Sequence, residues 1–169
     1  MVTALARFLR ISLSKGKNII TVADELEHAR NYLMIQSLRA KDQFTYRIEK
    51  DPGTECFQVI KLIVQPIVEN ALYHGIKNKR GKGRIVVTGR REKDKCVIRV
   101  EDNGIGMTKE RLNQVRGGLT TKIEDSNDFY GLYNVNERIR LKFGEEYGLS
   151  IDSVLQEGTC VEVWLPWES

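Results

Sequence analysis

Cysteine is scarce in this sequence, which contains only Cys56, Cys96 and Cys160 among its 169 residues. Three is an odd number, the spacings are wide, and no two cysteines are separated by only two residues. These features argue against a disulfide framework and against a zinc site. We therefore expect the chain to work in a reduced, cytoplasmic compartment.

Long hydrophobic runs are also lacking. No stretch approaches the roughly 18 consecutive apolar residues from which a membrane-spanning helix is inferred. Near the N-terminus the apolar residues are interrupted by Arg7, Arg10 and Lys15, and no small-residue cleavage site follows, unlike in a signal peptide. We expect no part of this chain to cross or contact a membrane.

Proline is rare, and neither sign of charge dominates. The sequence has three prolines, is 41% hydrophobic and 30% charged, and carries a net charge of +4. This composition excludes collagen-like, low-complexity and wholly disordered chains. Basic residues cluster only at 77–84 and at Arg90 and Arg91, so a nucleic-acid-binding domain is poorly supported. The length predicts one domain with room for an appendage.

Hydrophobic periodicity predicts helices at residues 3–13, from Thr21 onward, and at 59–73. Thr21 and Asp24 form a pattern typical of a capping box at a helix start. In the third helix, Pro66 predicts a kink or a late start. The second helix has one apolar stripe, made of Leu26, Ala29, Leu33 and Leu38.

Alternating apolar residues predict strands at 44–48, 84–89, 96–101, 149–153 and 161–165. The last four form two hairpins. A short helix is expected at 108–116 and another from Gly131 to Phe143, with a polar segment of lid length at 117–130 between them. This order predicts an α/β fold, a two-layer sandwich whose mixed, mostly antiparallel sheet is covered by helices on one face.

Asp102 stands where a predicted strand meets a glycine-rich turn. By the two-residue period of a strand, it continues the apolar face of Cys96, Ile98 and Val100. A carboxylate on that side needs a hydrogen-bond donor, and the exocyclic amine of a base is one. The glycines that follow let the backbone approach a flat ligand closely. The alternative interpretation is an ordinary turn that ends a strand.

Glu69, Asn70, His74 and Lys77 lie on the polar side of the strongest predicted helix. The last three are spaced i, i+4 and i+7, which predicts one stripe. Mg²⁺ keeps several waters and takes few protein oxygens, so one Asn amide with a polyphosphate suits it. The alternative is a solvated helix face.

Two further pairs are weaker signals when each is considered alone. Gly131 and Leu132 open a predicted helix, whose free N–H groups can receive an anion. Taken alone, a loop glycine that sets up a helix cap is the more common explanation of this pair. Gly158 and Thr159 precede the last strand and form an ordinary turn by default.

Four segments in order nevertheless resemble a known set of motifs. Residues 65–75 read QPIVENALYHG and resemble the N-box of histidine kinases, and residues 102–106, DNGIG, resemble the first glycine box. Residues 131–138, GLYNVNER, resemble the second glycine box, and Gly158 with Thr159 resemble the last element. The set resembles the ATP-binding domain shared by sensor histidine kinases, gyrase-type topoisomerases, ninety-kilodalton heat-shock chaperones and mismatch-repair ATPases.

Finer details resemble the YesM/LytS type of bacterial sensor histidine kinase. They are the Gln-Pro before Glu69, the His74-Gly75 pair, and residues 31–39, which read NYLMIQSLR. The resemblance extends from Leu5 to Pro166 and implies the Bergerat fold, with ATP and Mg²⁺ as ligands.

This resemblance implies a role for each candidate residue. Asp102 would accept a hydrogen bond from the adenine amine with help from Thr159, and Asn70 would bind Mg²⁺. His74 and Lys77 would face phosphate. Glu69 would be the general base that polarises an acceptor imidazole. The remaining nucleotide-binding positions are Gly104, Ile105, Gly106, Gly131 and Leu132.

Two departures from the family pattern stand out. Phe129 replaces a glycine that often precedes the second box, so lid closure over the phosphates would differ. The His-Phe-x-x-Asn segment that carries the acceptor histidine in this subfamily is absent. We interpret His28 as a surface histidine rather than an acceptor.

The resemblance therefore implies a catalytic domain that transfers the γ-phosphoryl of ATP to a histidine outside this chain. Residues 1–40 would be the tail of a dimerisation helix with a linker helix, and residues 41–169 the ATP-binding domain. The implied partners are the dimerisation helices of the same kinase and a response regulator, and the implied location is the cytoplasmic part of a membrane-anchored receptor. The alternatives are a nucleotide-binding regulatory module and a stand-alone ATPase or serine kinase of the same superfamily.

Overall fold

The computed structural model describes residues 18–41, 43–121 and 130–167. The predicted helix at 3–13, most of the predicted lid, and Phe129 lie outside these residues. The elements are β1 (Ile19–Thr21), α2 (Val22–Arg39), β2 (Phe44–Lys50), β3 (Gln58–Ile60), α3 (Gln65–Asn70), the π-helix η1 (Ala71–Ile76), β4 (Gly83–Glu92), β5 (Lys95–Asp102), α4 (Lys109–Gly118), α5 (Tyr130–Phe143), β6 (Gly148–Val154) and β7 (Gly158–Pro166).

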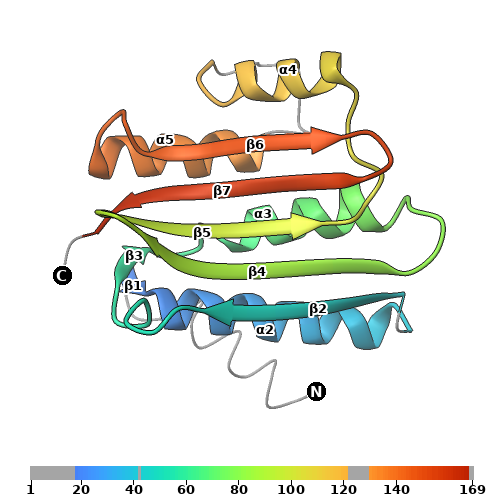
Figure 1. Ribbon diagram of the computed structural model, residues 1–169, viewed down its shortest axis with the longest axis horizontal. Coiled ribbons are helices and arrows are strands. Elements are labelled where there is room, and N and C mark those ends of the chain that lie inside the picture. Colours follow the sequence, from blue (N-terminus) through green and yellow to red (C-terminus); the bar gives the residue numbers. More distant parts are fainter. Residues whose placement is uncertain (1–17, 42, 122–129, 168–169) are drawn as a thin grey trace.

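The described residues form two layers. A five-stranded sheet has the order β2-β4-β5-β7-β6, and α2, α3 and α5 lie on its far side in Figure 1. Only β2 and β4 run parallel; the other neighbours are antiparallel. Short strands β1 and β3 pair separately. The predicted two-layer sandwich with helices on one face is confirmed, and so are both hairpins.

Helix α2 begins as the sequence predicts. Asp24 donates its backbone N–H to Thr21 Oγ1 at 3.1 Å, and the Thr21 N–H is bonded to the Asp24 carboxylate, which completes the capping box. Leu26 is buried as expected, but Leu38 is 58% exposed, because the last turns of α2 extend beyond the core. The interpretation of His28 as a surface residue is wrong, since it is only 1% exposed.

The strongest predicted helix begins later than its apolar periodicity suggests. Val59 and Ile60 lie in β3, and the helix starts at Gln65 with Pro66 in its first turn, which is the late start that this proline allows. A buried non-helical run shows the same apolar pattern as a buried helix, which explains the error. After Asn70 the helix widens, so that the N–H of Lys77 bonds the carbonyl of Leu72, five residues back.

The core lies between the sheet and the helices. Cys96, Ile98 and Val100 point from β5 toward the helices and are fully buried, as the alternation in the sequence predicts. Residues 117 and 118, expected in a polar loop, instead end α4. Among the described helices, none has the length and apolar character needed to cross a membrane. All three cysteines are free.

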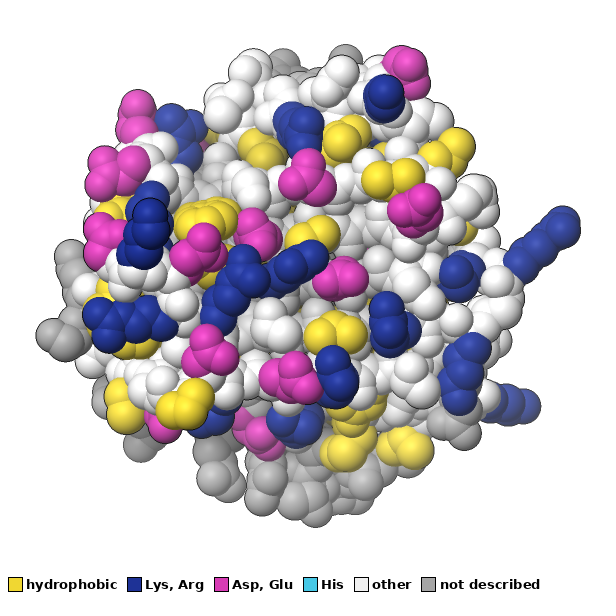
Figure 2. Space-filling view, in the orientation of Figure 1, with side chains coloured by type: hydrophobic (Ala, Val, Ile, Leu, Met, Phe, Trp, Pro, Cys, Tyr) yellow, Lys and Arg dark blue, Asp and Glu magenta, His cyan; other side chains and the backbone are white. Residues whose placement is uncertain are grey.

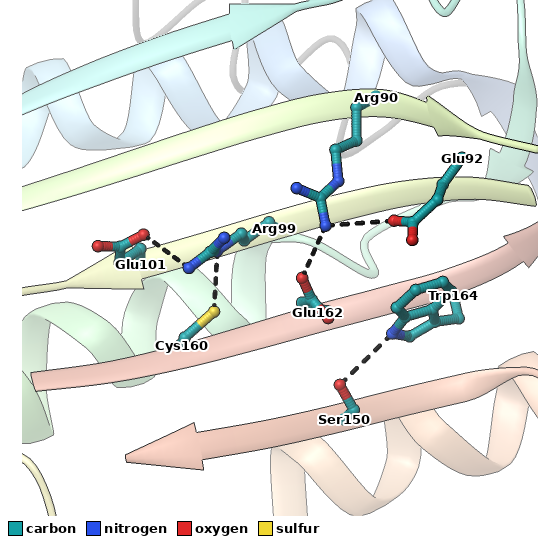
Figure 3. Close-up of polar contacts among 8 residues, drawn as sticks. All are labelled: Arg90, Glu92, Arg99, Glu101, Ser150, Cys160, Glu162 and Trp164. Carbon is teal, nitrogen blue, oxygen red and sulfur yellow. Dashed lines mark hydrogen bonds and ion pairs between the residues drawn. The ribbon is translucent and has the colours of Figure 1, made fainter. Parts of the chain in front are cut away.

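The opposite face of the sheet carries mixed charge, with both signs interspersed in Figure 2. Arg90 pairs with Glu162 at 3.1 Å, and Arg99 pairs with Glu101 at 3.1 Å, as Figure 3 shows. These half-buried pairs lie on the solvent-facing side of the sheet, where ion pairs contribute about 0–1 kcal/mol each. The helix-covered face, by contrast, holds both the core and the cavity described next.

Candidate functional site

An open cavity lies between the sheet and the helices. Its walls come from α3, η1, β5, β6, β7, α4 and α5. The lining residues are Ile67, Asn70, Ala71, His74, Gly75, Val100, Asp102, Gly106, Met107, Val115, Leu132, Ile151, Thr159 and Val161. The walls are mostly apolar, with a few polar groups that can fix the orientation of a ligand.

Asp102 is the buried charge of this cavity. It ends β5 on the inner face, is 6% exposed, and accepts a hydrogen bond from the Gly104 N–H at 2.7 Å. Burial raises the pKa of Asp102 from its ordinary 3.8 to about 6, while hydrogen bonds from the Gly104 and Thr159 backbones act in the opposite direction. The carboxylate is therefore ionised at neutral pH and can accept a further donor from a ligand.

The glycine-rich stretch after Asp102 packs directly against η1 and the β6–β7 hairpin. The N–H of Ile105 bonds the carbonyl of Gly75 at 3.1 Å, and a Cβ on Gly104 would overlap the Gly75 backbone. Gly106 has a φ of +61°, and a Cβ there would overlap the carbonyl of Val154. Gly106 lines the cavity, whereas Gly104 and Ile105 do not.

The polar stripe predicted on the strongest helix is divided in the structure. Asn70 and His74 line the cavity. Glu69 does not line it, and its Oε1 accepts a hydrogen bond from Gln65 Nε2 at 2.8 Å. Lys77 is exposed, with its Nζ 5.5 Å from the centre of the Tyr73 ring. The π-helical turn changes the spacing, because it places more residues in each turn than the α-helix assumed from the sequence.

The remaining candidates come from α5 and β7. Leu132 and Thr159 line the cavity, and the Thr159 hydroxyl lies 2.9 Å from that of Ser153. Gly131 is exposed at the start of α5, and a Cβ there would lie 3.7 Å from Pro66, an ordinary contact. Thr159 is also the register partner of Asp102, which places the last motif beside the first glycine box.

Sequence reasoning missed the apolar walls. Ile151 and Val161 line the cavity from inward positions of β6 and β7, and their alternation along the strands is a signal that could have found them. Val115 of α4 and Met107 complete this wall. No spacing in the sequence indicates that α4 reaches the cavity.

Two family models match the chain. The model for histidine kinase-, DNA gyrase B- and HSP90-like ATPases matches residues 58–169, and a histidine kinase model matches residues 1–44. The sensor histidine kinase YesM of Bacillus subtilis is 32% identical over 98% of this chain and 27% of its own length. BtsS of Escherichia coli is 29% identical over 99% of the chain, and LytS of Staphylococcus saprophyticus is 31% identical over 98%. The chain thus spans about a quarter of these relatives, 27–28% of their length.

Solved structures support the fold. The histidine kinase domain of a blue-light-activated kinase from Erythrobacter litoralis has a TM-score of 0.63 at 16% identity, covering 98% of this chain and 72% of that one. The catalytic domain of the histidine kinase ThkA has a TM-score of 0.62 at 14% identity, covering 88% and 94%. With the two family models, these similarities confirm the resemblance drawn from the motifs. The chain belongs to the histidine kinase-, DNA gyrase B- and HSP90-like ATPase family, and its curated relatives within that family are sensor histidine kinases.

Proposed function

We propose that this chain is the ATP·Mg-binding catalytic domain of a two-component sensor histidine kinase. It transfers the γ-phosphoryl of ATP to a histidine that this chain does not contain. The observation that carries the proposal is the buried Asp102 carboxylate in a cavity whose other polar side chains are those of Asn70, His74 and Thr159. Such a cavity suits a ligand with an amine-bearing base at one end and phosphates at the other.

In this proposal Asp102 accepts a hydrogen bond from the adenine amine. The apolar walls, with Val100, Ile151 and Leu132 among them, contact the faces of the base. Thr159 assists through its hydroxyl or through a water. The buried carboxylate selects a donor, because an acceptor in the same place would leave both groups unpaired.

Asn70 and His74 serve the phosphate end. The described residues include no cluster of three or more His, Cys, Asp or Glu side chains, so an ion held mainly by protein carboxylates does not fit this part of the chain. Mg²⁺ held by the Asn70 amide oxygen, phosphates and water does fit, because Mg²⁺ takes few protein ligands. When bound, the ion neutralises phosphate charge.

Glu69 is proposed to polarise the acceptor imidazole, and Lys77 to approach the phosphates from the exposed end of the π-helix. Gly104, Ile105, Gly106 and Gly131 supply backbone around the nucleotide. We assign residues 1–40 to the dimerisation and linker helices and residues 41–169 to the ATP-binding domain. The partners would be the dimerisation helices and a response regulator; the structure of ThkA with the regulator TrrA is one of the similar structures. The chain would work in the cytoplasm as part of a membrane-anchored receptor.

Calorimetric titration with ATP and Mg²⁺ tests the site. We expect micromolar-range binding by the parent chain, weakened about tenfold or more in Asp102→Asn and in Asn70→Ala, because each change removes a buried or ion-binding partner. Asp94→Asn and Asn113→Ala, both exposed and away from the cavity, are matched controls that should bind like the parent. Absence of binding by the parent would refute the proposal and favour a regulatory module that binds a partner protein.

Phosphoryl transfer is tested separately with radiolabelled ATP. The chain alone should acquire no acid-labile phosphate, whereas a dimerisation-helix fragment of its own kinase, added in trans, should be labelled. Stoichiometric labelling of the chain alone would contradict the proposal that the acceptor histidine lies outside this chain. Steady release of inorganic phosphate without any acceptor would favour a stand-alone ATPase.

A further inference from the structure

Glu25, on α2, is a carboxylate buried away from the cavity. It is 1% exposed, yet it lies within the apolar core beside Leu26. Its oxygens accept hydrogen bonds from the backbone N–H groups of Leu62 and, at 3.0 Å, Val64. A buried charge is costly unless it is paired and hydrogen-bonded, so these amides account for its presence there.

The amides that Glu25 receives belong to the approach to α3. The first amides of a helix have no partner within it, and α3 has no side-chain cap of its own. Glu25 supplies that acceptor from another helix, 39 residues away from Val64 along the chain.

The same segment is held from its other side by α5. Arg138 Nη2 donates to the carbonyl of Lys61 at 2.7 Å. Between the two attachments, Leu62 adopts a φ of +60°, a left-handed conformation that is uncommon for residues other than glycine. A strained backbone of this kind persists only where its surroundings determine it. Residues 61–64, called here the α3 approach, are therefore fixed jointly by α2 and α5.

The α3 approach leads directly to the proposed phosphate end of the site. Asn70 ends α3, and Gly131 and Leu132 open α5, which carries Arg138. We propose that Glu25 is a positioning residue, which fixes Asn70 relative to α2 and so makes the nucleotide site respond to displacement of α2. This inference rests on the proposed function. It gives α2 a regulatory role, since this helix follows the segment assigned to the dimerisation helix.

Amide hydrogen exchange tests the coupling without any nucleotide. Glu25→Gln replaces one acceptor oxygen with an amide donor while it preserves size. We expect faster exchange confined to residues 61–76, relative to β4 and β5. Leu26→Ala, on the same helix, is the matched control, because it removes buried apolar contacts and should accelerate exchange across the core without that selectivity.

The effect of Mg²⁺ on ATP affinity is a readout that a merely structural role would not move. We compare the dissociation constant of ATP with Mg²⁺ and with EDTA. The gain from Mg²⁺ is the factor by which Mg²⁺ lowers the dissociation constant of ATP. In Glu25→Gln this gain should shrink by about fivefold, the low end of ordinary coupling between sites, while the dissociation constant in EDTA is unchanged. In Leu26→Ala the gain should equal that of the parent. Arg138→Ala, an exposed change at the other attachment, should reduce the gain in the same direction and serves if Glu25→Gln does not fold.

The outcomes separate the two proposals. Uniform exchange in Glu25→Gln, or an unchanged gain from Mg²⁺ in both Glu25→Gln and Arg138→Ala, overturns the positioning role and leaves ATP binding intact. A parent chain that binds no ATP refutes the proposed function, and the exchange comparison then still decides whether Glu25 couples α2 to α3.

Discussion

At the scale of single residues, Asp102 links stability and binding in opposite directions. Its pKa in the folded chain is raised to about 6 by burial, against an ordinary value of 3.8. The folded state therefore disfavours the ionised carboxylate. The contribution of Asp102 to stability is fully present below pH 3.8 and is lost as pH rises through about 6. The ionised form is nevertheless the one that accepts a hydrogen bond from a ligand amine.

We predict that ATP affinity falls as pH decreases through about 6, while the free energy of unfolding gains from protonation of Asp102. The groups that act on this carboxyl from nearby are Glu101, which raises its pKa, and Lys79, which lowers it. Calorimetry and thermal denaturation at several pH values provide the two measurements.

Other groups also change protonation as the pH falls, because ATP itself titrates at about pH 6 and burial raises the pKa of Glu25. Comparison with Asp102→Asn isolates the effect of Asp102 from theirs. The difference between the parent and the variant should contain the step near pH 6 in both measurements. If the difference between the parent and Asp102→Asn does not change with pH, the assignment of the step near pH 6 to Asp102 is wrong.

At the scale of elements, the start of α5 is a place where the effect of a substitution on packing can be distinguished from its effect on ATP binding. A Cβ on Gly131 would make only an ordinary contact with Pro66, so packing does not require glycine there. Replacing glycine by alanine within a helix stabilises it by up to about 1 kcal/mol. We predict that Gly131→Ala is at least as stable as the parent in thermal denaturation but binds ATP more weakly, because its backbone is proposed to contact the nucleotide.

The control for this prediction is Gly117→Ala. Gly117 lies near the end of α4, with open space where a Cβ would be, so the same gain in helix stability is expected without any effect on ATP binding. Equal ATP affinities for the two variants would show that Gly131 does not contact the nucleotide.

Elements also show where sequence reasoning succeeds and where it fails. The alternation at Cys96, Ile98 and Val100 correctly places Asp102 on the inner face, because strand geometry fixes that relation locally. The π-helical turn after Asn70 and the strained Leu62 depend on tertiary partners, which no local pattern reveals. Glu25 was missed for the same reason: a single Glu on a helix appears solvated until the amides that it receives are known.

At the scale of the whole molecule, one core joins the elements that the structure describes. Its buried residues come from α2, α3 and both hairpins, and they include Val22, Leu33, Ile67, Ile98 and Leu165. The sequence predicted the layers and the hairpins but not the strand order, in which β2 pairs in parallel with β4 at one edge. Such long-range pairing follows from how the layers close around the core, since hairpin signals specify only neighbouring strands.

A single core predicts a single cooperative thermal transition for the described part of the chain. A ligand that binds only the folded state raises its stability, by about 2.7 kcal/mol at ~100 times the dissociation constant, so ATP with Mg²⁺ should raise the parent's midpoint. At neutral pH, Asp102→Asn should melt above the parent without nucleotide, because it no longer buries an ionised carboxylate, and ATP should then shift it little. Two separate transitions would show that α2 folds apart from the sheet, and a lower midpoint for Asp102→Asn would show that its carboxylate stabilises the fold. The expected pattern is the one in which a charge that the fold disfavours is retained because a ligand requires it.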